Sequence, residues 1–340
     1  MGRNNKSYRK DLHQQAYDKL VSMQAFGESK RAAVADGTAK GKIFSYSTYR
    51  DYWKHIKYFL KYVQGAHPEC TTLKAAKRHM NEWLQRRADE GLSAWTVQLE
   101  AKALGKLYGI GPEDEGYFVP PKRRREDITR SRVDRVRDRH FSETNNDELI
   151  KFCKGTGMRR SELSALLGKD LVTKEQIREA RGKLEAIAAA ERTPWEERRL
   201  AALRDAELFQ EEYFVHIRNG KGGRERFSPI IGRNAGQIIG RIRNTPPEEK
   251  VWRHVHQSAD IHAYRAAYAT AIYKSHARPI QEIPYDKVNR GTGKRYQSQV
   301  YTCRKDEAGK KLDKSAMLLC SKALGHNRIE VVANNYIRGL

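Results

Sequence analysis

The sequence lacks the cysteine spacing, apolar runs and leader that would place it in a membrane or an oxidising compartment. Its four cysteines (Cys70, Cys153, Cys303 and Cys320) are scattered, and none forms a C-x-x-C pair. We therefore expect reduced thiols rather than a zinc site or a disulfide framework. No apolar run approaches the length of a membrane span, and the N-terminus lacks the apolar core of a signal peptide. We expect a cytoplasmic protein with no membrane partner.

Acidic residues are the minority among the charged side chains. The 340 residues include 42 Asp and Glu against 66 Lys and Arg, which gives a net charge of +24. Self-repulsion at this charge opposes folding, so the excess needs a reason other than stability. A polyanion partner explains it, and nucleic acid is the commonest one, which favours association with the nucleoid. A generically basic or ribosome-associated protein is the alternative.

The length and the charge pattern predict four regions. A chain of 340 residues can form two domains of ordinary size. We expect a flexible basic arm over residues 1–43, a helical core-binding domain over 44–112, a basic linker over 113–139 and a larger domain over 140–340. The apolar residues between Leu12 and Val21 indicate one amphipathic helix within the arm.

The helical domain shows the apolar spacing of three helices. Ser47 or Thr48 can cap the first helix, the second runs from Leu73 to Asp89, and Ser93 begins the third. The aromatic residues of this bundle fit core packing better than base stacking. Its exterior is basic, and three lysines of the first helix are expected to contact DNA: Lys54, Lys57 and Lys61.

The linker holds the densest run of positive charge in the chain. Six of its basic residues are expected to contact DNA: Lys122, Arg123, Arg124, Arg125, Arg130 and Arg132. We interpret this segment as one that crosses a phosphate backbone, because charge neutralisation is the sequence-independent part of DNA affinity. A solvated linker, or a helix with internal ion pairs, is the alternative.

The larger domain is predicted to combine helices with one β-hairpin. Residues 173–208 are rich in Ala, Glu, Arg and Lys and predict a helical hairpin. Two alternating stretches, 213–218 and 226–231, predict a β-hairpin with Lys221 at its glycine-rich tip. Other helices are expected up to Gly155, over 259–275 and over 316–324. The fold class is therefore mainly α with a small β-hairpin or sheet, an α+β protein.

Four short segments supply the chemistry for attack on a phosphodiester without a metal. They are TGMRRSEL at 156–163, NGKGGRERFSPI at 219–230, HAYR at 262–265 and LGHNRIEVVANNYI at 324–337. Together they contain Arg159, Lys221, His262, Arg265, His326 and Tyr336. Two guanidiniums can bind phosphate oxygens in a bidentate way that lysine cannot copy, and a phenol needs a cationic site to react as phenolate. No carboxylate cluster of metal-ligand type accompanies them, so we expect no metal and no cofactor.

Each of these residues alone has a simpler structural interpretation. Arg159 fits an ion pair with Glu162, Lys221 fits a surface lysine on a glycine turn, and His326 fits a helix cap. His262 fits a half-buried histidine with satisfied hydrogen bonds. The order and spacing of the whole set favour a functional site.

In that order and spacing, the four segments resemble the tyrosine recombinase (phage integrase) family, and in particular its mobile-element integrases. The resemblance covers residues 45–340. It implies a helical, SAM-like core-binding domain, a basic linker and a C-terminal catalytic domain.

The resemblance assigns the reacting groups. Tyr336 would attack the scissile phosphate, form a 3′-phosphotyrosine and release a 5′-hydroxyl. Arg159 and Arg265 would hold the non-bridging phosphate oxygens. Lys221 would protonate the leaving 5′-oxygen.

The resemblance also assigns the supporting residues. His262 and His326 would orient the phosphate and assist proton transfer, with His262 as the general acid or base. Glu162 would hold Arg159 in place, and Arg224 beside Lys221 would contact DNA.

The implied function is site-specific DNA recombination through a Holliday junction without metal or ATP. The partners would be double-stranded DNA with specific sites, three further copies in a homotetramer, and an accessory directionality factor. Integration and excision of a mobile element fit the basic arm and the extra segments better than resolution of chromosome dimers. Two alternatives stay open: a type IB topoisomerase-like DNA relaxase, and a non-catalytic DNA-binding regulator that keeps the fold.

The sequence departs from the family pattern in three places. Residues 171–210 and 279–315 are longer than expected, and only Ile337 to Leu340 follow Tyr336. We therefore expect protomers to be linked by the N-terminal arm or by these longer segments, which are also candidates for DNA contact.

Overall fold

The computed structural model describes residues 10–124, 127, 141–283, 299–304, 307–326 and 328–337. The chain divides into two compact units, Met1–Ile128 and Thr129–Leu340. The division falls within the segment 113–139 that we expected to be a linker. Arg125, Arg130 and Arg132, which were expected to contact DNA, lie outside the described residues.

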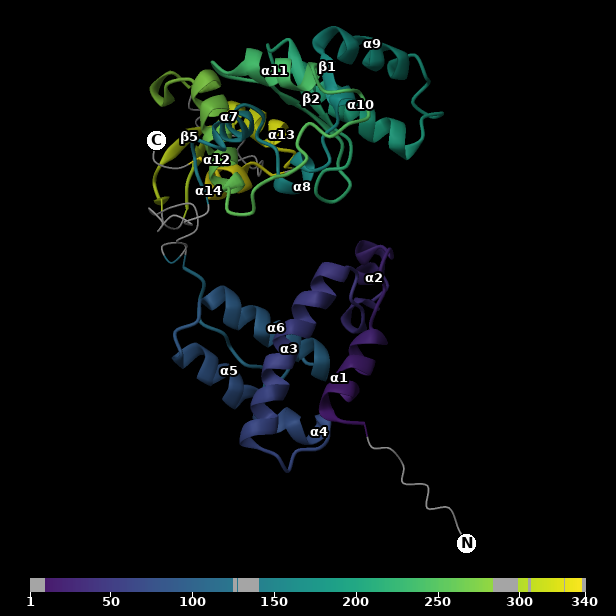
Figure 1. Cartoon of the computed structure of the whole chain (residues 1–340), viewed down its shortest axis with the longest axis vertical. Coiled ribbons are helices and arrows are strands. Elements are labelled where there is room, and N and C mark those ends of the chain that lie inside the picture. Colours follow the sequence, from purple (N-terminus) through teal and green to yellow (C-terminus); the bar gives the residue numbers. More distant parts are fainter. Residues whose placement is uncertain are drawn as a thin grey trace, which may run out of the picture. The chain divides into compact units, whose positions relative to one another are not determined.

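The helices and 3-10 turns of the first unit are the regular elements of its described residues (Figure 1). Its α-helices are α1 (Leu12–Val21), α2 (Lys30–Ala35), α3 (Tyr46–Ala66), α4 (Leu73–Ala76), α5 (Met80–Asp89) and α6 (Ala94–Tyr108), and its 3-10 turns are η1 (Ala39–Gly41) and η2 (Lys77–His79). Side chains of Ser45 and Ser93 accept hydrogen bonds from the first turns of α3 and α6, which fixes where these helices begin. The three predicted helices of this unit are confirmed, except that η2 interrupts the second. The predicted cap of the first helix was wrong: Ser45 caps it, and Ser47 and Thr48 lie within its first turn.

The segment expected to be a flexible arm is folded from Leu12 onward. Leu12, Ala16 and Leu20 of α1 are buried in the same core as Ile56 and Leu60 of α3. The apolar face of this helix supplies the energy that holds the segment on the bundle. Residues 12–43 are therefore part of the helical unit, although the amphipathic helix itself was predicted correctly.

The second unit is an α+β structure with two small antiparallel sheets. Its helices are α7 (Asp147–Thr156), α8 (Arg160–Leu163), α9 (Lys174–Glu185), α10 (Pro194–Glu207), α11 (Ala235–Arg243), α12 (Ile261–His276), α13 (Lys314–Ala323) and α14 (Ile329–Asn335), with 3-10 turns η3 (Gly168–Asp170) and η4 (Ile280–Glu282). The strands are β1 (Leu171–Thr173), β2 (Tyr213–Ile217), β3 (Arg226–Pro229), β4 (Val300–Thr302) and β5 (Lys311–Asp313). The mainly α fold class is confirmed.

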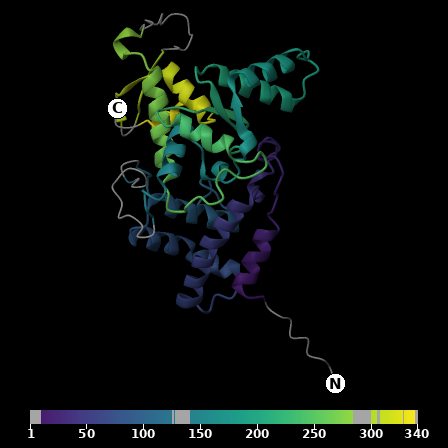
Figure 2. The same cartoon turned by 45° about the horizontal axis from the view of Figure 1, so that its top comes forward.

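The larger sheet has the order β1-β2-β3, and its register pairs Val215 with Ser228 and Ile217 with Arg226. The predicted hairpin is thus confirmed, with Lys221 in its loop. The predicted helical hairpin over 173–208 is also confirmed as α9 and α10, which lie side by side (Figure 1 and Figure 2). Thr173 and Thr193 cap these two helices, each in a reciprocal capping box.

Two apolar cores fill the second unit. One lies around α12, α13 and α14 and includes Met317, Leu324 and Tyr336. The other lies under α7 and α11 and includes Phe152 and Ile238. The polar residues described below lie where α7, α12, α13 and β3 approach one another. Among the described residues, no helix combines the length and the apolar content that a membrane span requires.

Candidate active site

A glycine turn positions the first arginine of the site. Helix α7 ends at Gly157, which adopts a left-handed conformation with φ of 60°, and Arg159 then precedes α8. A Cβ atom at Gly157 would lie 2.2 Å from Cδ1 of Tyr268. Only glycine therefore allows both the turn and the close packing of α12 against it.

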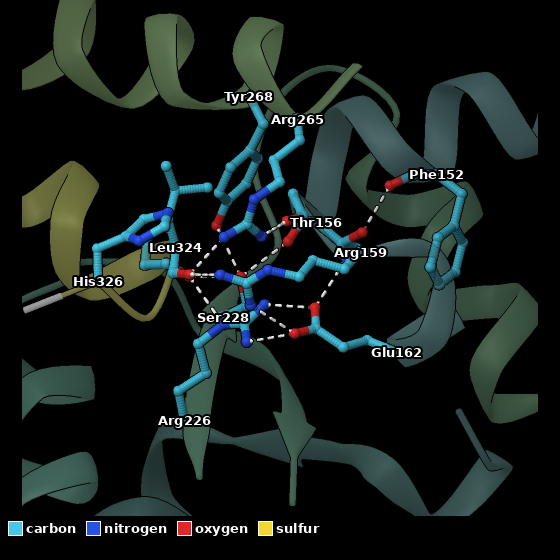
Figure 3. A network of polar contacts seen from close by, with 12 residues as sticks. Phe152, Thr156, Arg159, Glu162, Arg226, Ser228, Arg265, Tyr268, Leu324 and His326 are labelled. Carbon is cyan, nitrogen blue, oxygen red and sulfur yellow. Dashed lines mark hydrogen bonds and ion pairs between the residues drawn. The ribbon is translucent and has the colours of Figure 1, made fainter. Parts of the chain in front are cut away.

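Glu162 holds two arginines. Its carboxylate accepts hydrogen bonds from Arg159 Nη1 at 2.7 Å, from Arg226 Nη1 at 2.9 Å and from Arg226 Nη2 at 2.7 Å. Figure 3 shows both guanidiniums directed at this one carboxylate. Burial alone would raise the pKa of Glu162, but the hydrogen bonds and charge of Arg226 and the backbone N–H of Arg159 hold the pKa well below its usual range. Glu162 is therefore an anion at neutral pH.

Arg265 is the most deeply buried arginine of the cluster, with 2% of its surface exposed. It lies on the second turn of α12, where its two Nη groups donate to the carbonyl oxygens of Gly157 and Leu324. Its Nε lies 3.4 Å from the hydroxyl of Tyr336. Burial, together with the charges of Arg226 and Arg159, lowers the pKa of Arg265 to about 10. Arg265 still carries its charge at neutral pH.

The two guanidiniums predicted to hold a phosphate converge on one atom. Arg159 Nη2 lies 3.4 Å from the carbonyl oxygen of Leu324, and Arg265 Nη2 donates to the same oxygen (Figure 3). Arg226 Nε donates to the adjacent carbonyl of Ala323 at 3.1 Å. The cluster thus contains three guanidiniums and one carboxylate, that of Glu162, which hydrogen-bonds to two of them, so it carries excess positive charge in a largely buried place. Such a site favours an anionic ligand.

Tyr336 faces this cluster from the end of α14. It is 7% exposed, and its hydroxyl lies 3.4 Å from both Arg265 Nε and His326 Nε2. Its ring centroid lies 5.2 Å from that of His262 and 5.4 Å from that of His326. The structure therefore brings the phenol, both histidines and Arg265 together, although 71 residues separate Arg265 from Tyr336.

The neighbouring cations change the acidity of His326. Burial and the charges of Arg265, Arg159, Arg226 and Lys221 lower its pKa to about 3. His326 is thus neutral at pH 7, so its ring can donate one hydrogen bond and accept another without adding charge to the site. Its backbone is fixed by a 2.8 Å hydrogen bond from its N–H to the carbonyl of Ser321. Gly325, which precedes His326, makes the turn with φ of 67°. A Cβ atom at Gly325 would lie 2.9 Å from Cδ of Arg226.

Lys221 lies apart from the buried cluster. It occupies the exposed tip of the β2–β3 loop, which closes through a 2.8 Å hydrogen bond from Gly220 N–H to the carbonyl of Arg224. Its charge contributes to the lowered pKa of His326. Arg224 lies nearer, with Nη1 3.4 Å from the carbonyl oxygen of Gly325.

A cavity of about 400 Å³ adjoins the cluster next to His326. Helix α10 forms one wall with Arg198, and the β2–β3 hairpin forms the other with Arg218 and Arg224. Lys322 of α13 also lines it. The helical hairpin of α9 and α10, which the sequence marked as a departure, thus adds positive charge beside the candidate site.

The basic residues expected to contact DNA in the first unit lie on its surface. Lys54, Lys57 and Lys61 are exposed along α3, and the first two lie over the rings of Tyr58 and Trp53, respectively. The described linker residues Lys122, Arg123 and Arg124 are exposed as well, and Arg123 lies over the ring of Trp95.

Three buried residues that support the site were not predicted. Arg226, Ser228 and Tyr268 were read as parts of a regular strand and helix. The Ser228 hydroxyl donates to the carbonyl of Thr156 at 2.8 Å (Figure 3). The Tyr268 hydroxyl donates to the carbonyl of Pro229 at 2.8 Å. These bonds tie β3 to the end of α7 and to the middle of α12. Their only sequence signal is a polar pair, Arg226 and Ser228, that alternates with apolar residues beside a glycine-rich loop.

Comparisons with known proteins add little to this geometry. No protein-family model matches the sequence, and no curated protein matches it. Among solved structures, the crystal structure of XerA recombinase aligns with 95% of this chain and 94% of its own chain, at 13% sequence identity and a TM-score of 0.27.

Proposed function

We propose that the chain cleaves and rejoins DNA through a covalent bond to Tyr336, as a tyrosine-type site-specific recombinase. One observation carries the proposal. Two guanidiniums, of Arg159 and Arg265, converge on one carbonyl oxygen within a buried cluster, and the hydroxyl of Tyr336 lies 3.4 Å from Arg265 Nε. Fixed hydrogen-bond donors thus lie next to a nucleophile.

The first step is attack of the Tyr336 oxygen on the scissile phosphorus. A bond forms between the phenol oxygen and phosphorus, and the bond from phosphorus to the 5′-oxygen breaks. The product is a 3′-phosphotyrosine and a free 5′-hydroxyl. Arg159 and Arg265 stabilise the negative charge on the non-bridging oxygens, because their N–H groups are already fixed by Glu162, Gly157 and Leu324.

Proton transfer falls to the residues around the phenol. His262, whose ring centroid lies 5.2 Å from that of Tyr336, takes the phenol proton as general base. His326 is neutral because its pKa is lowered to about 3, and it donates or accepts a hydrogen bond without adding charge. Lys221 gives a proton to the leaving 5′-oxygen once DNA draws the hairpin tip over the phosphate. The reverse step, with a 5′-hydroxyl of another strand, releases Tyr336 and restores the phosphodiester.

The DNA would approach along basic surfaces of both units. The net charge of +24 and the exposed lysines of α3 supply the sequence-independent part of its affinity. Exchange between two duplexes, with a homotetramer, a Holliday junction and an accessory directionality factor, is the finer form of the proposal. Integration and excision of a mobile element are the implied tasks. A type IB topoisomerase-like relaxase would use the same cluster as a monomer, and a non-catalytic DNA-binding regulator would leave it unused.

A suicide-substrate assay tests the proposal. The full chain is mixed in EDTA with nicked duplexes from the flanks of its own gene, and protein–DNA adducts are counted on a denaturing gel. DNA bound in the same samples is measured on a native gel. We expect a slowly migrating adduct with the native chain and with Tyr213→Phe, a tyrosine of the same unit outside the cluster.

Tyr336→Phe separates the outcomes of this assay. We expect it to bind DNA as the native chain does and to form no adduct. If the native chain binds these duplexes and yields no adduct, the DNA-binding alternative replaces the recombinase proposal. Relaxation of supercoiled plasmid by a monomer, without recombinant products, would favour the relaxase.

A further inference from the structure

A second cluster of chemically active side chains lies in the first unit, far along the chain from the candidate active site. The donor atoms of His67, Glu69 and His79 all lie within 4.8 Å of one another. Glu82 joins them, with a carboxylate oxygen 3.0 Å from His79 Nδ1 and 3.5 Å from His67 Nε2. Two imidazoles and two carboxylates thus meet at one place.

The fold brings these residues together from separate elements. His67 ends α3, Glu69 follows in the turn, His79 ends the 3-10 turn η2, and Glu82 lies in the first turn of α5. The chain between them is anchored by buried residues of the core, among them Cys70 and Met80. The cluster is therefore built by the packing of α3 against α5 and is not a chance meeting of loop side chains.

We propose that His67, His79, Glu69 and Glu82 bind one divalent transition-metal ion, with zinc as the best match. Imidazole nitrogens with carboxylate oxygens are a donor set that suits zinc, and four such donors fill a tetrahedral shell. The two carboxylates balance the charge of the ion.

The surroundings of the cluster favour this role. The hydroxyl of Tyr62 donates to Glu82, which fixes that carboxylate as outer partners of metal ligands do. Arg78 is 61% exposed and donates to His79 at 3.1 Å, so it can turn away into solvent when an ion takes its place.

Binding requires one local change. The rings of His67 and His79 stack at 3.5 Å with an angle of 17° between their planes. One ion cannot lie in both of two parallel ring planes, so one imidazole must rotate about its side-chain bonds. Both side chains are partly exposed, at 22% and 14%, which leaves room for that rotation. The bound ion would link the end of α3, whose lysines are exposed, to α5.

Zinc titration of the full chain tests the proposal. The protein is freed of metal, and zinc is added in competition with a chromophoric chelator. We expect one tight site per chain, and at least about 10-fold weaker binding in His67→Ala, in His79→Ala and in Glu82→Gln. His13→Ala replaces a partly exposed histidine of the same unit outside the cluster and should bind as the native chain does. Circular dichroism shows whether each variant is folded.

Two further readouts make the result decisive. Zinc should raise the unfolding temperature of the native chain and of His13→Ala, and should leave that of folded His79→Ala unchanged. Cobalt in the same site should show no thiolate charge-transfer band, because the four described cysteines are buried and the proposed donors are nitrogen and oxygen. Three results would overturn the proposal: the absence of tight binding, an affinity of folded His67→Ala or His79→Ala equal to that of the native chain, or a thiolate band from Cys70.

Discussion

Arg226 forms a doubly hydrogen-bonded ion pair with Glu162, and both residues are buried, at 4% and 5% exposed. The pair links β3 to α8 across 64 residues of sequence. The carboxylate of Glu162 also accepts a hydrogen bond from the guanidinium of Arg159. Arg226 is therefore a positioning residue whose loss should disturb the site and the fold together.

Loss of the ion pair between Arg226 and Glu162 should lower the free energy of unfolding. Removing one partner of a buried ion pair leaves the other charge uncompensated, so Arg226→Ala should lower the unfolding free energy by about 3–5 kcal/mol. Arg253→Ala, which breaks the exposed pair with Glu249, should change it by no more than about 1 kcal/mol. Urea unfolding followed by fluorescence measures both. Equal effects would contradict the structural role of Arg226.

Gly157→Ala should be far more damaging than a glycine substitution in an open turn. At Gly157 a Cβ would lie 2.2 Å from a ring atom of Tyr268, whereas at Gly222, with φ of 78°, nothing lies within 4 Å. Both variants carry the backbone strain of a left-handed alanine, about 1 kcal/mol. Only Gly157→Ala adds a clash, so its unfolding midpoint in urea should fall clearly below that of Gly222→Ala. Similar midpoints would mean that α12 does not pack this closely.

Several parts of the fold were predictable because their causes are local. The cap Ser93 and the glycine-rich loop before Arg226 act within a few residues, and the sequence displays them. The helical hairpin of α9 and α10 was also predicted, from its content of Ala, Glu, Arg and Lys. Helix α11 was not anticipated, although Ile238 and Ile242 have helical spacing.

The sequence pointed to the residues of the candidate site, but not to the buried residues that position them. The motif order pointed to Arg159, Arg265 and Tyr336, yet nothing near Arg226 in the sequence reveals that its partner is Glu162. Contacts of this kind depend on how β3 packs against α8, which is a long-range property. The folding of residues 12–43 onto the helical unit was missed for the same reason, because its polar composition hides a buried face. Much of the segment 279–315 lies outside the described residues.

Acid should weaken the fold partly through His326. Its pKa is lowered to about 3 in the folded chain, whereas a histidine in an unfolded chain titrates near about 6.5. Between these values the unfolded chain binds a proton that the folded chain does not bind, so the unfolding free energy falls as pH decreases from about 6.5 toward 3. His326→Gln removes this contribution and should make the fall shallower. Urea unfolding between pH 7 and pH 4 measures it, and identical slopes would contradict the buried, cation-flanked position of His326.

Lys221 offers a chemical test of the leaving-group role. Lys221→Ala should slow cleavage of ordinary DNA strongly, because a 5′-oxygen leaves poorly without a proton. A substrate with sulfur at the bridging 5′ position has a better leaving group that needs no proton. We expect this substrate to restore cleavage in Lys221→Ala but not in Arg265→Ala, as quantified by adduct formed over time. If sulfur does not help Lys221→Ala, the lysine acts otherwise, for example by binding DNA.

The most direct measurement is the identity of the residue that carries DNA in a trapped adduct. Adduct from a nicked duplex is digested with protease and nuclease, and the nucleotide-bearing peptide is sequenced by tandem mass spectrometry. We expect the nucleotide on Tyr336, whose hydroxyl lies 3.4 Å from Arg265 Nε. A nucleotide on any other residue, or a DNA complex that yields no covalent peptide under conditions of full binding, would contradict Tyr336 as the nucleophile.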